Sequence, residues 1–506
     1  MVFSSMVFIF VFLPAVILLY YVFPWRAWRN TLLCVASLLF YAWGEPIYVL
    51  LMLFSVLINY GAGLLLQKTS VDKSVKKWKK ITKRSKKESI KHSKTSTAIL
   101  VVTIILNLSV LLIFKYSDFF ITNINATFSL ELRQLNLPLP IGISFYTFQA
   151  LSYIIDVYRR KVEPQRNPIY LAMYIAFFPQ LIAGPIVRYT DVANDIRNRK
   201  ETLEGFSAGL IKFFVGLASK VILANNLAVF VDSVFSDLSD AGSVILWLAS
   251  LSYMMQIFFD FAGYSLMAIG LGQMFGFKFP NNFNKPYTAS SVTDFWRRWH
   301  ITLSTWFRDY VYIPLGGNRC HPARHVFNIL ITWLLTGFWH GAEWNFVLWG
   351  LYYAIFLLLE KYVFSSFVPI SNKNSENSAK FPKKTKVAAC FYRFVTLFIV
   401  LFGWVLFRIE NMNDLASALG TMFSFKSGNV ALYMVEHAAS CSKLIYLVPA
   451  IIAAGNIPSA IAARIRGSLP QSVYFALKAF VTLVLFVVSV LFLIASSYNP
   501  FIYFRF

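Results

Sequence analysis

Residues 97–114 of the chain read TAILVVTIILNLSVLLIF, a run without a charged side chain that is long enough to cross a bilayer when its apolar flank is included. Directly before it, residues 68–94 hold twelve Lys or Arg and only two acidic residues. Short loops rich in Lys and Arg stay on the cytoplasmic side, where they face anionic headgroups. The sequence therefore predicts a basic cytoplasmic loop followed directly by a membrane-spanning helix.

Apolar runs separated by short polar loops continue through all 506 residues, of which 58% are hydrophobic and 14% charged. Soluble globular chains average roughly 45–50% apolar and about 25% charged residues. Candidate spans lie near residues 3–23, 31–43, 46–66, 97–121, 139–157, 168–187, 206–235, 243–275, 325–364, 387–408, 443–463 and 472–497. We predict an all-α, polytopic transmembrane bundle, a single domain over residues 1–506 with roughly ten to thirteen spans plus re-entrant or interfacial helices.

The formal charge of +24 does not indicate nucleic-acid binding, because the basic residues sit in short runs between apolar segments. A second such run, residues 371–386, is expected to be another cytoplasmic loop. The four cysteines are scattered without C-x-x-C spacing, so we expect neither a metal site nor a disulfide framework. Membrane lipids are the partners that the charge pattern predicts.

Ionisable residues inside apolar segments are costly and are therefore functional candidates. His340 lies in WLLTGFWHGAEWN, residues 333–345, with Gly337 and Gly341 removing side-chain bulk on either side. We expect that this leaves room for another molecule beside the ring. A desolvated, neutral imidazole suits a general base that takes a proton from a hydroxyl group. The alternative is a buried histidine that only hydrogen-bonds across helices.

Glu343 follows His340 by three residues, so on one continuous helix it could orient the ring or extend to the interface. A second candidate histidine, His300, lies in DFWRRWHITLSTWFRD, residues 294–309. If this stretch is helical, His300, Ser304 and Arg308 share a face and Arg297 joins them. Together they suit an anionic or carbonyl-bearing group. The competing interpretation is an interfacial aromatic belt.

Asp260 is a carboxylate inside an apolar span, and we expect it to pair with an arginine of the 297–308 stretch. The turn at residues 314–319, PLGGNR, could offer backbone N–H groups to an anion, although most glycine pairs in turns are only turns. The 278–323 region is too polar for lipid and too aromatic for an idle loop. We place it in a protein-lined cavity or at the membrane interface.

Several of these motifs resemble the core of the membrane-bound O-acyltransferase family. They are Trp299-His300 with YIPLGG at residues 312–317, GFWHG at 337–341, LPIGISF at 139–145, FPQLIAGPI at 178–186 and NPFIYF at 499–504. The likeness is strongest to the bacterial branch that acylates alginate, peptidoglycan and teichoic acid. The resemblance implies a helical bundle around a central pore, with the family's invariant histidine at His340 and its second histidine at His300.

The resemblance further implies an O-acyltransferase in the bacterial cytoplasmic (inner) membrane that needs no bound cofactor. The donor would be acetyl-CoA or an acylated carrier, and the acceptor a polysaccharide or a periplasmic acetyltransferase- or esterase-like partner. The candidate substrate-binding residues are Arg297, Arg298, Trp299, Ser304, Arg308, Trp339, Glu343 and Asn345. His340 could act as base or as nucleophile. Other readings are D-alanyl transfer to teichoic acid, a secondary transporter or flippase, and a non-catalytic scaffold.

Overall fold

A computed structural model describes residues 1–69, 92–364, 386–424, 428–496 and 498–501. Over these ranges the chain is helical and contains no strand, in agreement with the predicted all-α fold. Six helical segments are long and apolar enough to cross a membrane, and one bent helix pair is a possible seventh. They are Tyr48–Lys68, Lys94–Phe128, Leu203–Ser236, Ser243–Met274, Cys390–Arg408 and Gln471–Ala495, with the pair Val430–Glu436 and Ala438–Ala454. The basic loops at residues 68–94 and 371–386 lie, except for their ends, outside the described residues.

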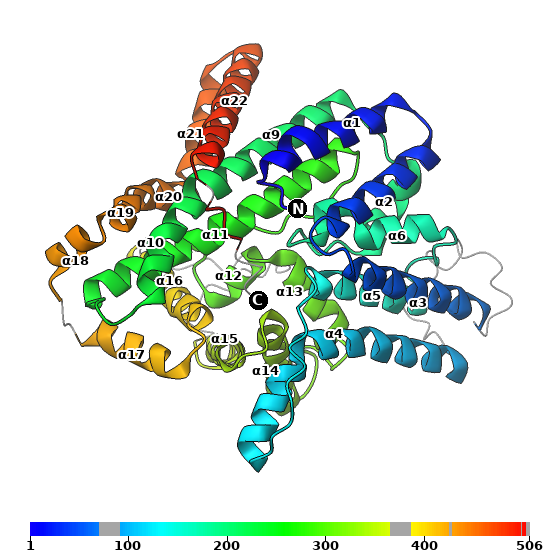
Figure 1. Ribbon diagram of the computed structural model, residues 1–506, viewed down its shortest axis with the longest axis horizontal. Coiled ribbons are helices and arrows are strands. Elements are labelled where there is room, and N and C mark those ends of the chain that lie inside the picture. Colours follow the sequence, from blue (N-terminus) through cyan, green and yellow to red (C-terminus); the bar gives the residue numbers. More distant parts are fainter. Residues whose placement is uncertain (70–91, 365–385, 425–427, 497, 502–506) are drawn as a thin grey trace. The chain divides into compact units, whose positions relative to one another are not determined.

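Two compact units make up the chain, the first formed by Met1–Phe213 and Met267–Pro280, the second by Phe214–Leu266 and Asn281–Phe506. The single-domain expectation stays a prediction. The first unit contains η1 (Phe8–Phe12), α1 (Leu13–Val22), α2 (Arg26–Ala42), α3 (Tyr48–Lys68), α4 (Lys94–Phe128), α5 (Ile143–Tyr158), α6 (Pro168–Ala176), α7 (Phe178–Leu181), α8 (Tyr189–Asn198) and most of α9 (Leu203–Ala218) (Figure 1).

The second unit carries the residues that the sequence singles out. It contains η3 (Ser219–Ala224), α10 (Asn225–Ser236), most of α11 (Ser243–Met274), η4 (Pro286–Thr288), α12 (Val292–Arg298), α13 (Ile301–Phe307), η5 (Arg308–Tyr312), α14 (Pro322–His340), α15 (Trp344–Tyr362), α16 (Lys386–Arg408), α17 (Met412–Phe423), α18 (Val430–Glu436), α19 (Ala438–Cys441), η6 (Ser442–Tyr446), α20 (Leu447–Ala454), α21 (Ile457–Ser468) and α22 (Gln471–Ala495).

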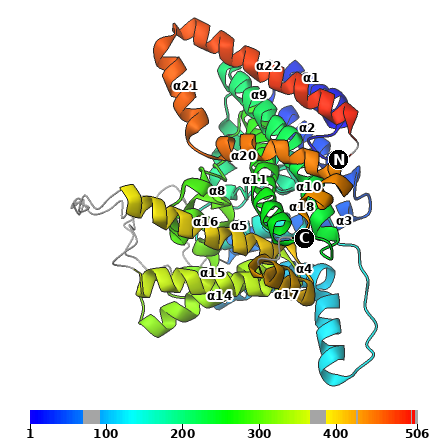
Figure 2. The same ribbon diagram turned by 90° about the vertical axis from the view of Figure 1, so that its left-hand side faces the viewer.

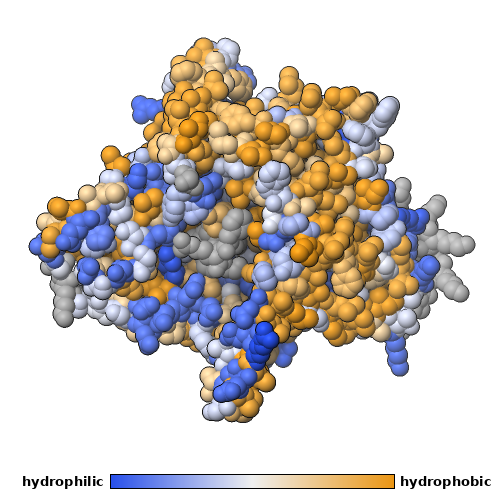
Figure 3. Space-filling view, viewed as in Figure 1, coloured by the Kyte–Doolittle hydropathy of each residue, from blue (hydrophilic) through white to orange (hydrophobic). Residues whose placement is uncertain are grey.

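Apolar side chains face outward along many of these helices, as lipid-exposed surfaces require. Figure 3 shows hydrophobic residues over much of the face formed by α1 to α3. Leu39 of α2 and Leu57 of α3 are 62% and 63% exposed. Exposed apolar area of this extent is rare on soluble monomers. The surface therefore agrees with a multi-pass membrane protein.

Buried amides join α3 to α4 in the first unit. Asn59 Nδ2 donates to Asn107 Oδ1 at 2.9 Å, and Ser55 Oγ donates to the same oxygen at 3.2 Å. Such interhelical hydrogen bonds are worth about 0.6–2 kcal/mol each in membrane bundles. They explain why amides occur in otherwise apolar helices.

The Glu201 carboxylate, which lies outside the candidate spans, connects the first two α-helices of the first unit to the segment before α9. Glu201 accepts from Arg26 at 2.6 Å and lies 3.0 Å from an Arg29 guanidinium nitrogen. The Tyr20 hydroxyl also donates to Glu201 at 2.6 Å. Burial alone raises the pKa of Glu201, but the hydrogen bonds from Arg26 and Tyr20 outweigh it and lower the pKa to about 2. Glu201 therefore links α1 and α2 to the start of α9.

The apolar segment expected at residues 325–364 is a helical hairpin, because α14 ends at His340 and α15 begins at Trp344 (Figures 1 and 2). Glycines let the two helices approach closely. A Cβ on Gly337 would lie 3.2 Å from the Gly350 Cα and nearer still to the Phe346 carbonyl oxygen. The expectation that Gly337 and Gly341 leave room for another molecule is therefore wrong, since α15 fills that space.

We predict that Gly337→Ala destabilises the protein in detergent. The new methyl group would overlap α15 backbone, and overpacking of this kind costs about 1–3 kcal/mol. Gly61→Ala in α3 is the matched control, because nothing lies within 4 Å of its Cβ position. The control should be neutral or slightly stabilising. Thermal unfolding monitored by circular dichroism measures both, and equal midpoints would contradict the close α14–α15 contact.

Candidate functional site

His340 is the last residue of α14 and is 7% exposed. Aromatic rings surround its imidazole. The ring centroids of Trp339, Trp349 and Phe407 lie 4.9, 5.2 and 5.1 Å from that of His340. These rings come from α14, α15 and α16, so three helices enclose the imidazole in an environment poor in water.

His300 lies at a break between α12 and α13 and is 1% exposed. Its backbone has φ +42°, in the left-handed region that non-glycine residues rarely adopt. The ring packs edge-to-face on Phe261 of α11, with centroids 4.6 Å apart. Nδ1 lies 3.1 Å from the Asn282 side-chain oxygen. The imidazole is therefore held on several sides by the second unit.

Trp339 connects the two histidines. Its ring centroid lies 6.1 Å from that of His300 and 4.9 Å from that of His340. The tryptophan is 4% exposed. Although the two histidines are forty positions apart in the sequence, the fold brings them to the same buried aromatic cluster. The fold thus places the two candidate histidines close together, and their membership of one catalytic site stays a prediction.

Electrostatics favours an uncharged imidazole at His300, which lies outside the candidate spans. Burial lowers the pKa of His300 well below its usual value, and the charge that His340 can carry lowers it further. A lowered pKa keeps the ring neutral at and below pH 7. His300 therefore offers a hydrogen-bond acceptor near neutral pH.

The expectation of one helical face through residues 297–308 is wrong in part. Arg297 belongs to α12, whereas Ser304 lies on α13, beyond the break at His300. Arg297 is exposed and Ser304 is half-buried, and the Ser304 N–H donates to the His300 carbonyl oxygen at 3.1 Å. The break separates the two residues because His300 leaves the helical conformation.

Two of the candidate arginines already have acidic partners. Arg298 Nε donates to Asp294 at 2.9 Å, and Arg308 Nε donates to its neighbour Asp309 at 2.7 Å. Arg308 is exposed, and Arg298 is partly buried. Both side chains lie near His300 in the sequence, but these ion pairs occupy part of their hydrogen-bonding capacity.

Three further candidate residues, Glu343, Asn345 and Trp299, differ in their exposure and contacts. Glu343 is exposed and precedes the first residue of α15, so it does not share a helical face with His340 as expected. Asn345 is fully buried and donates to the Leu406 and Phe407 carbonyl oxygens of α16, both at 3.3 Å. Trp299 is 3% exposed and packs on Trp404 with a centroid distance of 4.7 Å. Asn345 and Trp299 thus hold neighbouring helices together around the histidines.

Asp260 pairs with a lysine, and the expected arginine partner is wrong. Lys220 Nζ lies 2.6 Å from Asp260 Oδ1, and both side chains are at most 4% exposed. The same amine donates to the Pro500 carbonyl oxygen at 2.6 Å and lies 5.3 Å from the Phe501 ring centroid. This ion pair therefore also binds the NPF segment near the C-terminus.

Asn282 and Glu360 were not among the residues predicted from the sequence, but both hold the segment around His300. Glu360 of α15 accepts hydrogen bonds from the N–H groups of Val292 and Thr293, at 2.5 and 2.8 Å, at the start of α12. A carboxylate at a helix N-terminus is stabilising there. The signal that could have revealed Glu360 is an acidic residue within the apolar run of residues 344–362.

The anion site suggested for the turn at residues 314–319 finds no support. The Gly316 N–H donates to the Ile313 carbonyl oxygen at 3.0 Å, and the Gly317 N–H donates to the Tyr312 carbonyl oxygen at 2.9 Å. Both donors are therefore used within the turn. The turn is structural in this conformation.

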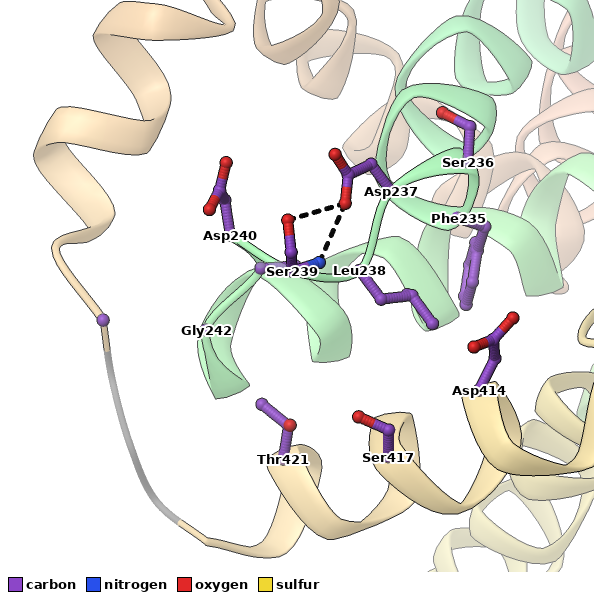
Figure 4. Close-up of a pocket in the computed structure, with 12 residues that line it drawn as sticks. Phe235, Ser236, Asp237, Leu238, Ser239, Asp240, Gly242, Asp414, Ser417 and Thr421 are labelled. Carbon is purple, nitrogen blue, oxygen red and sulfur yellow. Dashed lines mark hydrogen bonds between the residues drawn. The ribbon is translucent and has the colours of Figure 1, made fainter.

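A separate, open cavity of about 620 Å³ lies between the α10–α11 turn and α17 (Figure 4). Asp237 and Asp240 line it on one side, and Asp414 lines it on the other. The Asp237 carboxylate accepts from the Ser239 N–H and hydroxyl groups at 3.0 and 2.7 Å. No histidine or cysteine is among its lining residues.

Within the described part of the chain, no group of three His, Cys, Asp or Glu residues could hold a metal ion. The Asn282 amide lies beside His300, and the Trp339 indole lies beside both histidines. These groups can bind and orient an organic substrate through hydrogen bonds.

Comparisons with known proteins identify relatives across the whole chain. Residues 89–384 match the model of the membrane-bound O-acyltransferase family. A probable alginate O-acetylase of Azotobacter vinelandii is 37% identical over 540 residues, covering all of both chains. A peptidoglycan O-acetyltransferase of Helicobacter pylori is 34% identical over 455 residues, which cover 83% of this chain and 80% of the relative. A teichoic acid D-alanyltransferase of Bacillus subtilis is 32% identical over 228 residues, covering 43% and 58%.

We predict that Lys220→Ala lowers the free energy of unfolding by about 3–5 kcal/mol, because it leaves the buried Asp260 carboxylate without its cation. Replacing both partners, as Lys220→Met with Asp260→Leu, should restore much of that loss. Arg308→Ala is the control, since an exposed pair contributes about 1 kcal/mol or less. Denaturant unfolding in detergent measures the three variants. Similar losses for Lys220→Ala and Arg308→Ala would contradict the buried pair.

Proposed function

Because the chain belongs to the membrane-bound O-acyltransferase family, we propose that this O-acyltransferase moves an acetyl group from a cytoplasmic thioester donor to a hydroxyl group of a cell-envelope or exported polysaccharide. The observation that carries the proposal is the pair of buried histidines joined through Trp339. Relatives named for alginate and peptidoglycan acetylation cover most or all of the chain, which favours acetyl transfer to such polymers.

The proposed site lies in a bundle of roughly ten to thirteen spans around a central pore in the bacterial cytoplasmic membrane. Donor and acceptor would enter this pore from opposite faces. The donor is acetyl-CoA or an acylated carrier, both of which present an activated thioester. Exposed Arg297 and Arg308 would meet the anionic groups of the donor.

His340 would act as the general base. It takes the proton of the acceptor hydroxyl while the oxygen attacks the thioester carbonyl, and the tetrahedral intermediate then expels the thiolate. The imidazolium returns the proton to that sulfur, so the ring ends neutral. Positioning and a dry environment supply the rest of the catalysis. Alternatively, His340 attacks the thioester itself and carries the acetyl group before the hydroxyl displaces it.

The acceptor is either the sugar hydroxyl itself or a hydroxyl on a periplasmic partner that passes the acetyl group on. D-alanyl transfer to teichoic acid is the weaker alternative, because the matching teichoic acid D-alanyltransferase aligns with only 43% of this chain.

A secondary transporter or flippase predicts that activity needs a gradient across a sealed membrane. An O-acyltransferase should still transfer labelled acetyl as purified protein in detergent, where no gradient exists, and a transporter should not.

We predict that His340→Ala lowers acetyl transfer by at least about 100-fold, since a general base contributes 10²–10⁴-fold. The protein should still insert and fold. His437→Ala is the matched control in the same unit, because its ring stacks on Tyr433 at 4.1 Å and takes no part in the site. Transfer of radiolabelled acetyl from a thioester to the envelope polymer measures both. Normal acetyl content in the His340 variant would eliminate the catalytic assignment.

A further inference from the structure

We propose that Asn282 is a positioning residue that fixes the tautomer of His300 and leaves the His300 Nε2 lone pair as the reactive acceptor; this inference rests on the proposed function. Asn282 is 1% exposed and lies in the segment before α12. Its side chain contacts the His300 ring, and its backbone carbonyl oxygen accepts from the next residue, Ile301.

The orientation of the Asn282 amide follows from its neighbours. Its side-chain oxygen lies 3.3 Å from the Thr302 backbone nitrogen, which can only donate. The Thr302 hydroxyl donates to the same oxygen at 2.9 Å. Reversing the amide would place its NH₂ group against the Thr302 N–H, donor against donor. The oxygen therefore faces Thr302 and His300.

This orientation determines the protonation of the His300 ring. Nδ1 lies 3.1 Å from the Asn282 oxygen, so a stable contact requires a proton on Nδ1. A neutral ring then carries its lone pair on Nε2. Among the residues that the structure describes, none hydrogen-bonds Nε2, which is buried. An unoccupied acceptor at this depth points to a donor on a bound substrate.

The backbone of Asn282 supports the same arrangement. Its carbonyl oxygen accepts from the Ile301 N–H at 2.9 Å, directly after the left-handed His300. Two residues on, the Asn284 N–H donates to the Arg298 carbonyl oxygen at 2.9 Å. Backbone strain of about 1–3 kcal/mol persists only where surrounding contacts fix it. The Asn282 segment thus holds the break that turns the His300 ring toward Trp339.

The chemistry of His300 follows from these contacts. A bare Nε2 can accept a proton or a hydrogen bond from a hydroxyl group, but it cannot donate to a thioester carbonyl. The groups that face the ring are Phe261 of α11, together with Trp339 and the titratable His340 of α14. Arg298, the nearest cation in the sequence, is paired with Asp294. His300 would therefore orient the acceptor hydroxyl beside His340.

The decisive experiment is the pH dependence of kcat/KM for Asn282→Asp. A carboxylate keeps the acceptor oxygen but adds a negative charge beside Nδ1–H, which favours the imidazolium and raises the pKa of His300. Since the neutral ring is the active form, the acidic limb of the profile should move to higher pH by about 1 unit or more. Asn282→Ala should lower kcat/KM at every pH by roughly 10- to 100-fold, the usual effect of losing an orienting partner.

Thr302→Val is the matched control, because it removes a hydrogen bond to the same oxygen without touching the ring. It should leave the acidic limb where it is. If Asn282→Asp lowers kcat/KM at every pH while the acidic limb stays where it is in wild-type protein, Asn282 has only a structural role and the inference is overturned. An unmoved acidic limb would leave the proposed function intact, provided that wild-type protein transfers acetyl and His340→Ala does not. Absence of transfer by wild-type protein would instead defeat the proposed function.

Solid-state NMR tests the tautomer without relying on the folding of an Asn282 variant. The chain has six histidines, so ¹⁵N-histidine spectra of wild-type protein and of His300→Gln identify the His300 signals by difference. We expect a protonated Nδ1 and an unprotonated Nε2 at pH 7. A protonated Nε2 would contradict the assignment.

Discussion

Several polar groups that this chain buries among apolar helices find partners inside the protein, because lipid offers none. That constraint explains the Asn59–Asn107 contact between α3 and α4 and the ion pair of Lys220 with Asp260. It also explains the use of Glu360 as a cap for α12. Of these contacts, the Glu360 cap fixes the start of α12, and His300 lies just beyond the end of that short helix. The geometry of the site therefore depends on the internal satisfaction of buried polar groups.

Much of the fold could be predicted from composition, because long apolar runs and basic loops are local signals. His340 could be singled out for the same reason, as an ionisable residue within apolar sequence, and His300 through its place in the polar, aromatic region at residues 278–323. The reversal after His340 could not, since Gly337 reads equally well as open space or as a close helix contact. The Lys220 partner of Asp260 is forty positions distant, and no local pattern connects them. Asn282 acts through a left-handed His300 backbone that no helical pattern predicts.

The enclosure of the site by aromatic rings suits acyl transfer from a thioester. Thioesters are already activated, so the protein's main tasks are to exclude water and to align the reacting groups. Rings from α14, α15 and α16 surround His340, and Phe261 of α11 covers His300. A desolvated site also strengthens each hydrogen bond to the substrate. The neutral His300 imidazole can accept a proton directly, because it carries no extra proton that it would first have to lose.

In the proposed function, donor and acceptor reach the histidine pair from opposite faces of the membrane. The most direct test loads sealed, right-side-out vesicles that contain the chain with radiolabelled acetyl-CoA and follows the label. We expect acetyl to appear on the outer polymer, and ionophores that dissipate ion gradients should not stop this transfer. Label that remains inside, or transfer that ends when the gradients are dissipated, would rule out acyl transfer across the membrane through this site.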